Sequence, residues 1–126
     1  MTLLDQIENF EKNTGYKISN SLKSTLEKTN GLEGEWISKI EKFKNWTPIK
    51  KHQWFLNDEF TKEEEIKIKD TYVIGDIMIN SHQWGIKFNN KGEKEIIMEL
   101  DTFDKVADSL EDFILKFNKE PYDLVK

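Results

Sequence analysis

The two histidines, His52 and His82, are the side chains with the widest range of possible chemistry in this 126-residue chain. Ser81 directly precedes His82, and a serine becomes a nucleophile when a histidine activates it and a third group orients the imidazole. Adjacent residues on a strand point to opposite faces, however, so this spacing does not bring the hydroxyl and the ring together. We therefore interpret His82 as an ordinary loop residue and expect no Ser–His–Asp site.

A metal site from His82, Asp76 and one further carboxylate is possible in principle, since imidazole and carboxylate groups are common Zn²⁺ ligands. No HxxxH pair or paired spacing of histidine and aspartate supports such a site, and a chain without cysteine offers no thiolate ligand or nucleophile. Glu63, Glu64 and Glu65 could hold a cation or act as acid and base, but glutamates at the start of a helix are typical of a solvated face. We expect neither a metal nor a catalytic residue.

The basic residues argue against nucleic-acid binding. All 19 are lysines and the formal net charge is −5, whereas surfaces that bind phosphates and bases usually use the planar guanidinium of arginine. The run Lys-Lys-His-Gln-Trp at 50–54 combines bases with an aromatic ring, as single-strand binders do, but Asp58 and Glu59 follow it closely. We interpret it as surface lysines beside a core or half-buried Trp54. Neither GxGxxG nor GxxxxGK[ST] occurs, so no nucleotide cofactor is expected.

Two acidic clusters remain. One spans residues 58–65, and the other comprises Glu99, Asp101, Asp104, Asp108, Glu111 and Asp112. Such charge either serves solubility alone or forms an electronegative face that steers a basic partner. Trp84 is a further candidate because tryptophan is enriched in binding hot spots, although its alternation with Ile86 and Phe88 favours the core unless it lies at the rim of a sheet. The candidate partner-binding residues are Trp84, Glu99, Asp101, Asp104, Asp108, Asp58 and Glu63.

Helical periodicity predicts helices at both ends of the chain. The first carries Leu3, Leu4, Ile7 and Phe10 on one stripe, is capped by Thr2 with Asp5, and ends at Gly15. A second helix follows Ile18, with Ser19, Asn20 or Ser21 as its cap and Leu22 and Leu26 inward, and stops at Asn30-Gly31. The final helix is capped by Ser109, ends over residues 118–121, and has an apolar stripe of Val106, Leu110, Phe113, Ile114 and Phe117.

The middle of the chain is predicted to form an antiparallel sheet. We expect a short strand at 36–40, an irregular segment at 44–57, a helix at 61–67 capped by Thr61, and strands at 72–74, 76–80, 84–89 and 93–100. The last two strands form a hairpin through residues 89–92. Along 93–100, Ile96, Met98 and Leu100 share one face, opposite Glu95, Ile97 and Glu99. The prediction is a one-sided sheet covered by the final helix.

Length and composition fit one α+β domain over residues 1–126. The expected architecture is an antiparallel sheet of about four to six strands packed against N-terminal and C-terminal helices. The aromatic content of 12% excludes intrinsic disorder. No apolar run approaches the roughly 20 residues of a membrane span, and the first ten residues carry Asp5, Gln6 and Glu8, unlike a signal peptide. We expect a cytoplasmic protein that does not bind membranes.

The order of these features resembles the SMI1/KNR4 (SUKH) superfamily over residues 1–118. The resemblance rests on an N-terminal amphipathic helix, on Thr14-Gly15-Tyr16-Lys17-Ile18 leading into a second helix, and on Thr29-Asn30-Gly31 ending it. It rests further on Tyr72-Val73-Ile74-Gly75-Asp76, on the hairpin at 84–100, and on Ser109-Leu110-Glu111-Asp112-Phe113-Ile114.

This resemblance implies a non-enzymatic binding domain. Many bacterial members of the superfamily are immunity proteins that neutralise a toxin, often a nuclease, encoded beside them, and fungal members are larger regulators of cell-wall synthesis. The implied partner is a cognate toxin with a basic surface, bound by a monomer or weak homodimer. A regulatory or scaffolding module is the alternative. A small enzyme is a third hypothesis. The variants His52→Ala and His82→Ala would distinguish it from a binding domain, because only an enzyme that uses a histidine would lose its function while the fold stays intact. No residue carries over from the family as catalytic.

Overall fold

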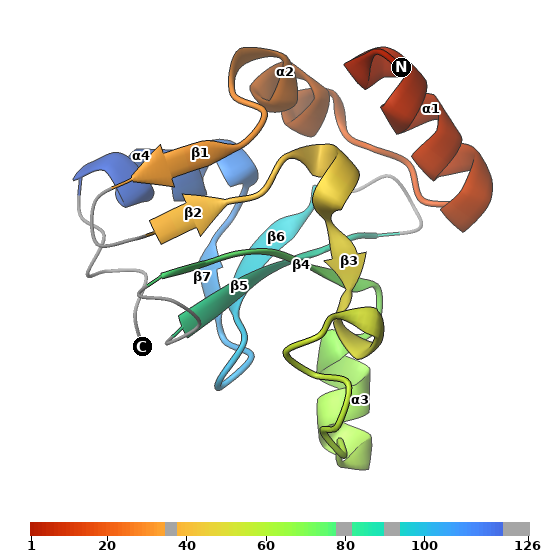
Figure 1. Cartoon of the computed structure of the whole chain (residues 1–126), viewed down its shortest axis with the longest axis vertical. Coiled ribbons are helices and arrows are strands. Elements are labelled where there is room, and N and C mark those ends of the chain that lie inside the picture. Colours follow the sequence, from red (N-terminus) through yellow and green to blue (C-terminus); the bar gives the residue numbers. More distant parts are fainter. Residues whose placement is uncertain (35–37, 78–81, 90–93, 120–126) are drawn as a thin grey trace.

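The computed structural model describes residues 1–34, 38–77, 82–89 and 94–119, and these form one antiparallel sheet with helices on both faces (Figure 1). The helices are α1 (Leu3–Thr14), α2 (Asn20–Lys28), α3 (Lys62–Ile68) and α4 (Leu110–Lys119). The strands are β1 (Leu32–Gly34), β2 (Ser38–Ile40), β3 (Thr47–Pro48), β4 (Thr71–Ile77), β5 (His82–Lys87), β6 (Ile96–Glu99) and β7 (Lys105–Ala107). They are ordered β1-β2-β4-β5-β6-β7, and the two-residue β3 pairs with β4. The predicted single-domain α+β fold is confirmed.

The helices begin at side chains that the sequence identifies. Thr2 accepts a hydrogen bond from the Asp5 amide at 3.1 Å, and the Asp5 carboxylate accepts one from the Thr2 amide at 3.2 Å, which is a complete capping box. Ser19 caps α2, and Thr61 with Glu64 forms a second capping box at α3. Gly15 ends α1 in the left-handed conformation, with φ 81°.

Several predicted boundaries differ in the structure. The strands expected at 72–74 and 76–80 are one strand, β4, whose pairing with β5 shifts between Val73 and Gly75, and residues 78–80 lie outside the described part. Val106 belongs to β7 and not to the final helix. β1 and β7 were not predicted, because three-residue strands carry too little periodicity. The strand expected at 36–40 is described only as Ser38–Ile40, and the segment expected to be irregular contains β3 and two 3₁₀ turns, Phe43–Asn45 and Ile49–Lys51.

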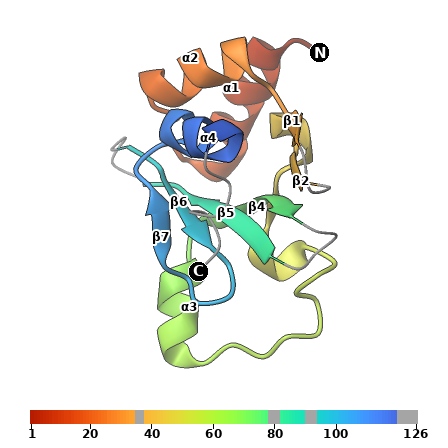
Figure 2. The same cartoon turned by 90° about the vertical axis from the view of Figure 1, so that its left-hand side faces the viewer.

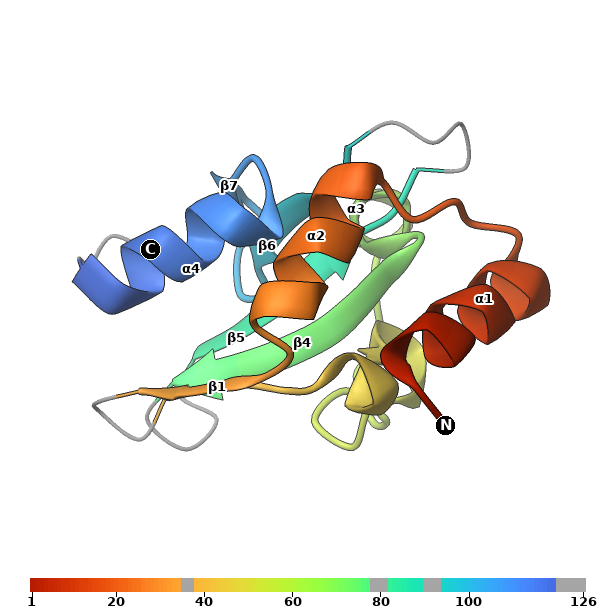
Figure 3. The same ribbon diagram turned by 90° about the horizontal axis from the view of Figure 1, so that it is seen from above.

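The helices divide between the two faces of the sheet. Figure 2 shows α1, α2 and α4 on one side and α3 on the other, and Figure 3 shows α4, α2 and α1 side by side across the strands. Among the helices of the described residues, none combines the length and apolar character needed to span a membrane.

The sheet is buried on both faces, so the prediction of a one-sided sheet is wrong. Ile97 joins Trp84 and Ile86 in the larger core under α1, α2 and α4. Met98 and Leu100 point the other way, into a second core. This second core also contains Ile49, Phe55, Ile68 and Val73, with Trp54, Phe60 and Phe103 packed against it. The segment after β3 and α3 fold back beneath the sheet, and alternation along one strand cannot reveal that cover.

Gly75 lets the β1–β2 hairpin lie against the rest of the sheet. It is paired with Ile40 of β2. A Cβ atom built at Gly75 would stand 2.1 Å from the Lys39 carbonyl oxygen and 3.0 Å from the Ile40 Cα. Both neighbours are backbone atoms, so neither can rotate away as a side chain could.

We expect Gly75→Ala to lower the free energy of unfolding by about 2–3 kcal/mol, because overpacking against a fixed backbone forces strands apart. Urea denaturation measures the change as a lower midpoint at an unaltered slope. Glu33→Ala, on an exposed residue of β1, is the control and should remain within about 0.5 kcal/mol of wild type. A Gly75→Ala variant as stable as the control would contradict this account of the β2–β4 contact.

Candidate protein-binding surface

Trp84 is a core residue and is therefore not a candidate for partner binding. It is 0% exposed. Its ring packs edge-on against two rings of α4, with centroids 4.9 Å from Phe113 and 5.8 Å from Phe117. It therefore lies in the middle of the sheet. Only a position at the rim of the sheet would let it anchor a partner. The alternation with Ile86 and Phe88 predicted this burial correctly.

Glu99 is not a candidate for partner binding either, because it is 0% exposed and cannot contribute a surface charge. One carboxylate oxygen, Oε1, accepts a hydrogen bond from the Asp101 amide at 2.6 Å. The other, Oε2, accepts bonds from the Thr102 amide and hydroxyl, both at 2.9 Å. A buried charge costs free energy unless hydrogen bonds replace its hydration. Glu99 meets that requirement by holding the turn after β6, which is a structural role.

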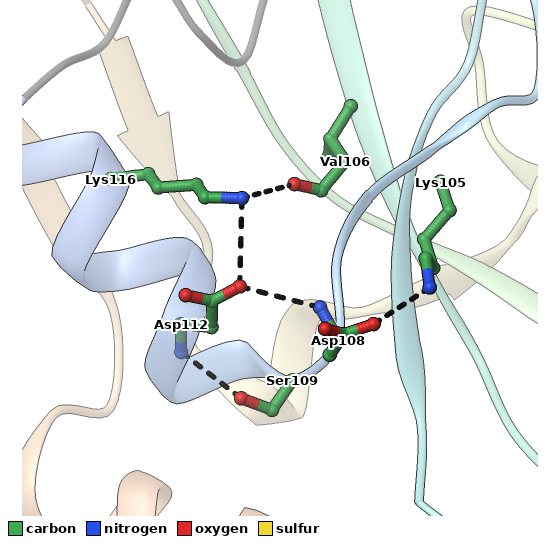
Figure 4. Close-up of polar contacts among 6 residues, drawn as sticks. All are labelled: Lys105, Val106, Asp108, Ser109, Asp112 and Lys116. Atoms are coloured by element: carbon green, nitrogen blue, oxygen red, sulfur yellow. Dashed lines mark hydrogen bonds and ion pairs between the residues drawn. The ribbon is translucent and has the colours of Figure 1, made fainter.

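Asp108 and Asp112 are locally compensated by lysines (Figure 4). The Lys105 ammonium lies 2.7 Å from the Asp108 carboxylate, and this hydrogen bond and its charge lower the pKa of Asp108. Lys116 lies 3.6 Å from Asp112 and donates to the Val106 carbonyl at 3.0 Å. These pairs neutralise the charge around the start of α4, so Asp108 is a weaker candidate for steering a partner than the sequence suggests.

Four of the remaining acids, two from each cluster, lie next to a pair of phenylalanines that contact each other. Asp58 and Glu59 are exposed and precede Phe60, while Asp101 and Asp104 are exposed on either side of Phe103. The Phe60 and Phe103 rings contact each other edge-on, with centroids 6.5 Å apart. Both rings pack against the second core. We call Asp58, Glu59, Asp101 and Asp104 the acidic surface.

The acidic surface is not neutralised within the described residues. None of its four carboxylates has a lysine within ion-pair distance there, unlike Asp108 and Asp112. Glu63 is exposed in the first turn of α3 and adds to the same charged segment. Sequence reasoning found both clusters but not their convergence. The sequence feature that could have indicated this convergence is the presence of an apolar residue within each acidic segment, Phe60 in one and Phe103 in the other.

The basic run at 50–54 is tied into the fold. Lys50 forms an ion pair with Glu65. The rings of His52 and Trp54 lie 4.1 Å apart, and the Trp54 amide donates to His52 Nδ1 at 3.2 Å. Burial lowers the pKa of His52, although the charges of Glu41 and Asp76 oppose that shift. These contacts give the run a packing role, which agrees with its interpretation as lysines beside a half-buried tryptophan.

His82 lies beside the carboxylates of Glu99 and Asp101, which are distant from it in the sequence. Ligand atoms of His82, Glu99 and Asp101 all lie within 4.8 Å of one another, and Asp76 is not part of this group. The pairing of Trp84 with Glu99 explains the proximity, because continuing that register by two residues sets His82 opposite Asp101. The Nδ1 atom of His82 is buried without a hydrogen-bond partner among the described residues.

We expect Glu99→Gln to lower the free energy of unfolding by about 1.5–3 kcal/mol. The substitution replaces one buried carboxylate oxygen, which accepts hydrogen bonds from the turn, with an amide nitrogen, which can only donate. Chemical denaturation measures this change, and Asp104→Asn is the matched carboxylate-to-amide control at an exposed position. The control should alter stability by less than about 0.5 kcal/mol. Equal stability of the two variants would show that Glu99 does not hold the turn.

Comparison with known proteins identifies one family. The sequence model of the SMI1 / KNR4 family (SUKH-1) matches residues 2–116. No curated protein and no solved structure matches the chain significantly. The match covers every strand and helix described above except the last residues of α4. The chain therefore belongs to the SMI1/KNR4 (SUKH-1) family.

Proposed function

We propose that this protein is a non-enzymatic immunity protein that binds and neutralises a cognate bacterial toxin, a nuclease or another polymorphic toxin, in the cytoplasm. The observation that carries the proposal is the acidic surface. Two segments about 40 residues apart in sequence place exposed, uncompensated carboxylates together. Membership of the SUKH family, whose members are generally non-catalytic, is consistent with this role.

The electrostatics suit a basic partner. A nuclease presents a positively charged surface for phosphates, and a group of unpaired carboxylates attracts such a surface over a distance of about one Debye length. Binding of this kind needs no reactive side chain. An interface of standard size, about 1,600 Å² in total, supports nanomolar or tighter affinity when its contacts are well matched.

The acidic surface also has a defined shape, which favours specific binding over general charge attraction. Phe60 and Phe103 rest on the second core, so the carboxylates beside them stand on packed structure. Glu99 fixes the turn that carries Asp101. Groups held in place before binding lose less conformational entropy when the complex forms.

A regulatory or scaffolding module remains the second candidate, because the SMI1/KNR4 family is not defined by toxin neutralisation alone. This candidate requires a cellular partner unrelated to any toxin. The two candidates share the acidic surface and differ in the partner that it binds. We also propose that the protein acts as a monomer or weak homodimer. In the described part of the chain, the outermost strands, β1 and β7, offer three residues each for edge-to-edge pairing.

The test of the immunity role uses the product of the gene beside this one. We expect the two proteins to co-purify and the toxin's activity to fall. We expect Asp58→Lys/Glu59→Lys/Asp104→Lys to slow association by tenfold or more at low salt, with a smaller loss at high salt, because steering is screened by ions. Stopped-flow or surface-based kinetics measure the association rates at low and at high salt.

The matched control is Glu8→Lys/Glu27→Lys/Glu33→Lys. It changes the net charge equally at three exposed glutamates of α1, α2 and β1. It should slow association much less than the triple variant of the acidic surface. Equal effects of the two variants would show that net charge and not this surface guides binding. A harmless neighbour that fails to bind would exclude the immunity role and leave the regulatory candidate.

A further inference from the structure

Three side chains that commonly bind metals meet where β5 begins and the turn after β6 starts. The ligand atoms of His82, Glu99 and Asp101 lie within 4.8 Å of one another. The strands themselves enforce this arrangement, because Trp84 pairs with Glu99 and the Leu100 amide donates to the Gln83 carbonyl at 2.9 Å. His82 and Glu99 therefore lie in paired strands, and Asp101 lies in the turn that Glu99 holds.

The imidazole of His82 has an unmet bonding capacity. Its Nδ1 atom is buried and has no hydrogen-bond partner among residues 1–34, 38–77, 82–89 and 94–119. A buried polar atom is normally paired, so an unpaired one calls for an explanation, and an unobserved ion is one. Neutral imidazole uses a ring nitrogen lone pair to bind a transition metal.

We propose that His82, Glu99 and Asp101 bind one divalent transition-metal ion of the Zn²⁺ class. One imidazole with two carboxylates is a donor set that suits Zn²⁺, whereas Ca²⁺ and Mg²⁺ prefer sites made of oxygen atoms alone. A water molecule would complete a four-coordinate site.

The two carboxylates are suited to different parts in binding. Glu99 is fully buried, and three hydrogen bonds from Asp101 and Thr102 already fix its orientation, as outer contacts of metal ligands do. Asp101 is exposed, so its side chain can rotate toward the other two residues until all three ligand atoms lie about 2.0–2.2 Å from one ion. The ion would connect the first residue of β5 to the turn after β6. It would also offset the charge of Asp101, so that Asp58, Glu59 and Asp104 would remain as the uncompensated carboxylates of the acidic surface. This proposal does not depend on the proposed function.

The experiment is calorimetric titration of the untagged, chelator-treated full chain with ZnCl₂ and, in a separate arm, with CaCl₂. We expect one Zn²⁺ per chain, no measurable Ca²⁺ binding, and a higher melting temperature with Zn²⁺. His82→Ala and Asp101→Asn should each weaken Zn²⁺ binding at least tenfold. The matched controls are His52→Ala, at the only other histidine, and Asp104→Asn, at an exposed aspartate close by, and both should bind as wild type does.

Three results would overturn the proposal. They are no saturable Zn²⁺ binding, binding that survives both His82→Ala and Asp101→Asn, and binding that is lost in His52→Ala. If His82→Ala fails to fold, Asp101→Asn alone decides, because an exposed side chain is replaced by one of nearly the same shape. These measurements use no toxin, so their outcome is separate from that of the neutralisation assay.

Discussion

The antiparallel pairing of β5 with β6 is the constraint on which the rest of the structure depends. It sets Trp84 opposite Glu99 and Ile86 opposite Ile97. Cross-strand partners lie on the same face of a sheet, so Ile97 enters the larger core and Met98 enters the second core. A slip of one residue would exchange the two faces. Met98 and Leu100 would then enter the larger core, and Ile97 would enter the second core together with Glu95 and Glu99, which would lose the hydrogen bonds that satisfy them. The register therefore decides which face each helix covers.

The same register buries two carboxylates, which then organise the segments around the sheet. Glu95 accepts hydrogen bonds from the amide and hydroxyl of Ser19, at 2.9 and 2.7 Å, and so joins β6 to the start of α2. Glu99, at the other end of β6, holds the turn that leads to β7. Both glutamates lie on the face that carries the larger core, and hydrogen bonds from distant or turn residues replace their lost hydration.

The distribution of charge follows from packing more than from the number of acids. Lysines compensate Asp108 and Asp112, and Glu99 is buried, so half of the second acidic cluster contributes little to the surface potential. The contact between Phe60 and Phe103 instead unites exposed acids from two distant segments. The proposed binding surface thus lies where two rings that pack against the second core meet solvent, next to exposed acids.

The sequence by itself determined where the helices begin, the α+β class and the family, because capping residues, apolar periodicity and motif order are local signals. Thr2, Ser19 and Thr61 act as predicted, and Trp84 is buried as its alternation indicates. Only the tertiary structure decided that the sheet has two cores, that Glu99 is internal and that His82 faces Asp101. These properties depend on strand register and on a cover supplied by residues far along the chain. No local pattern encodes them, since an alternating strand looks the same whether one or both of its faces are buried.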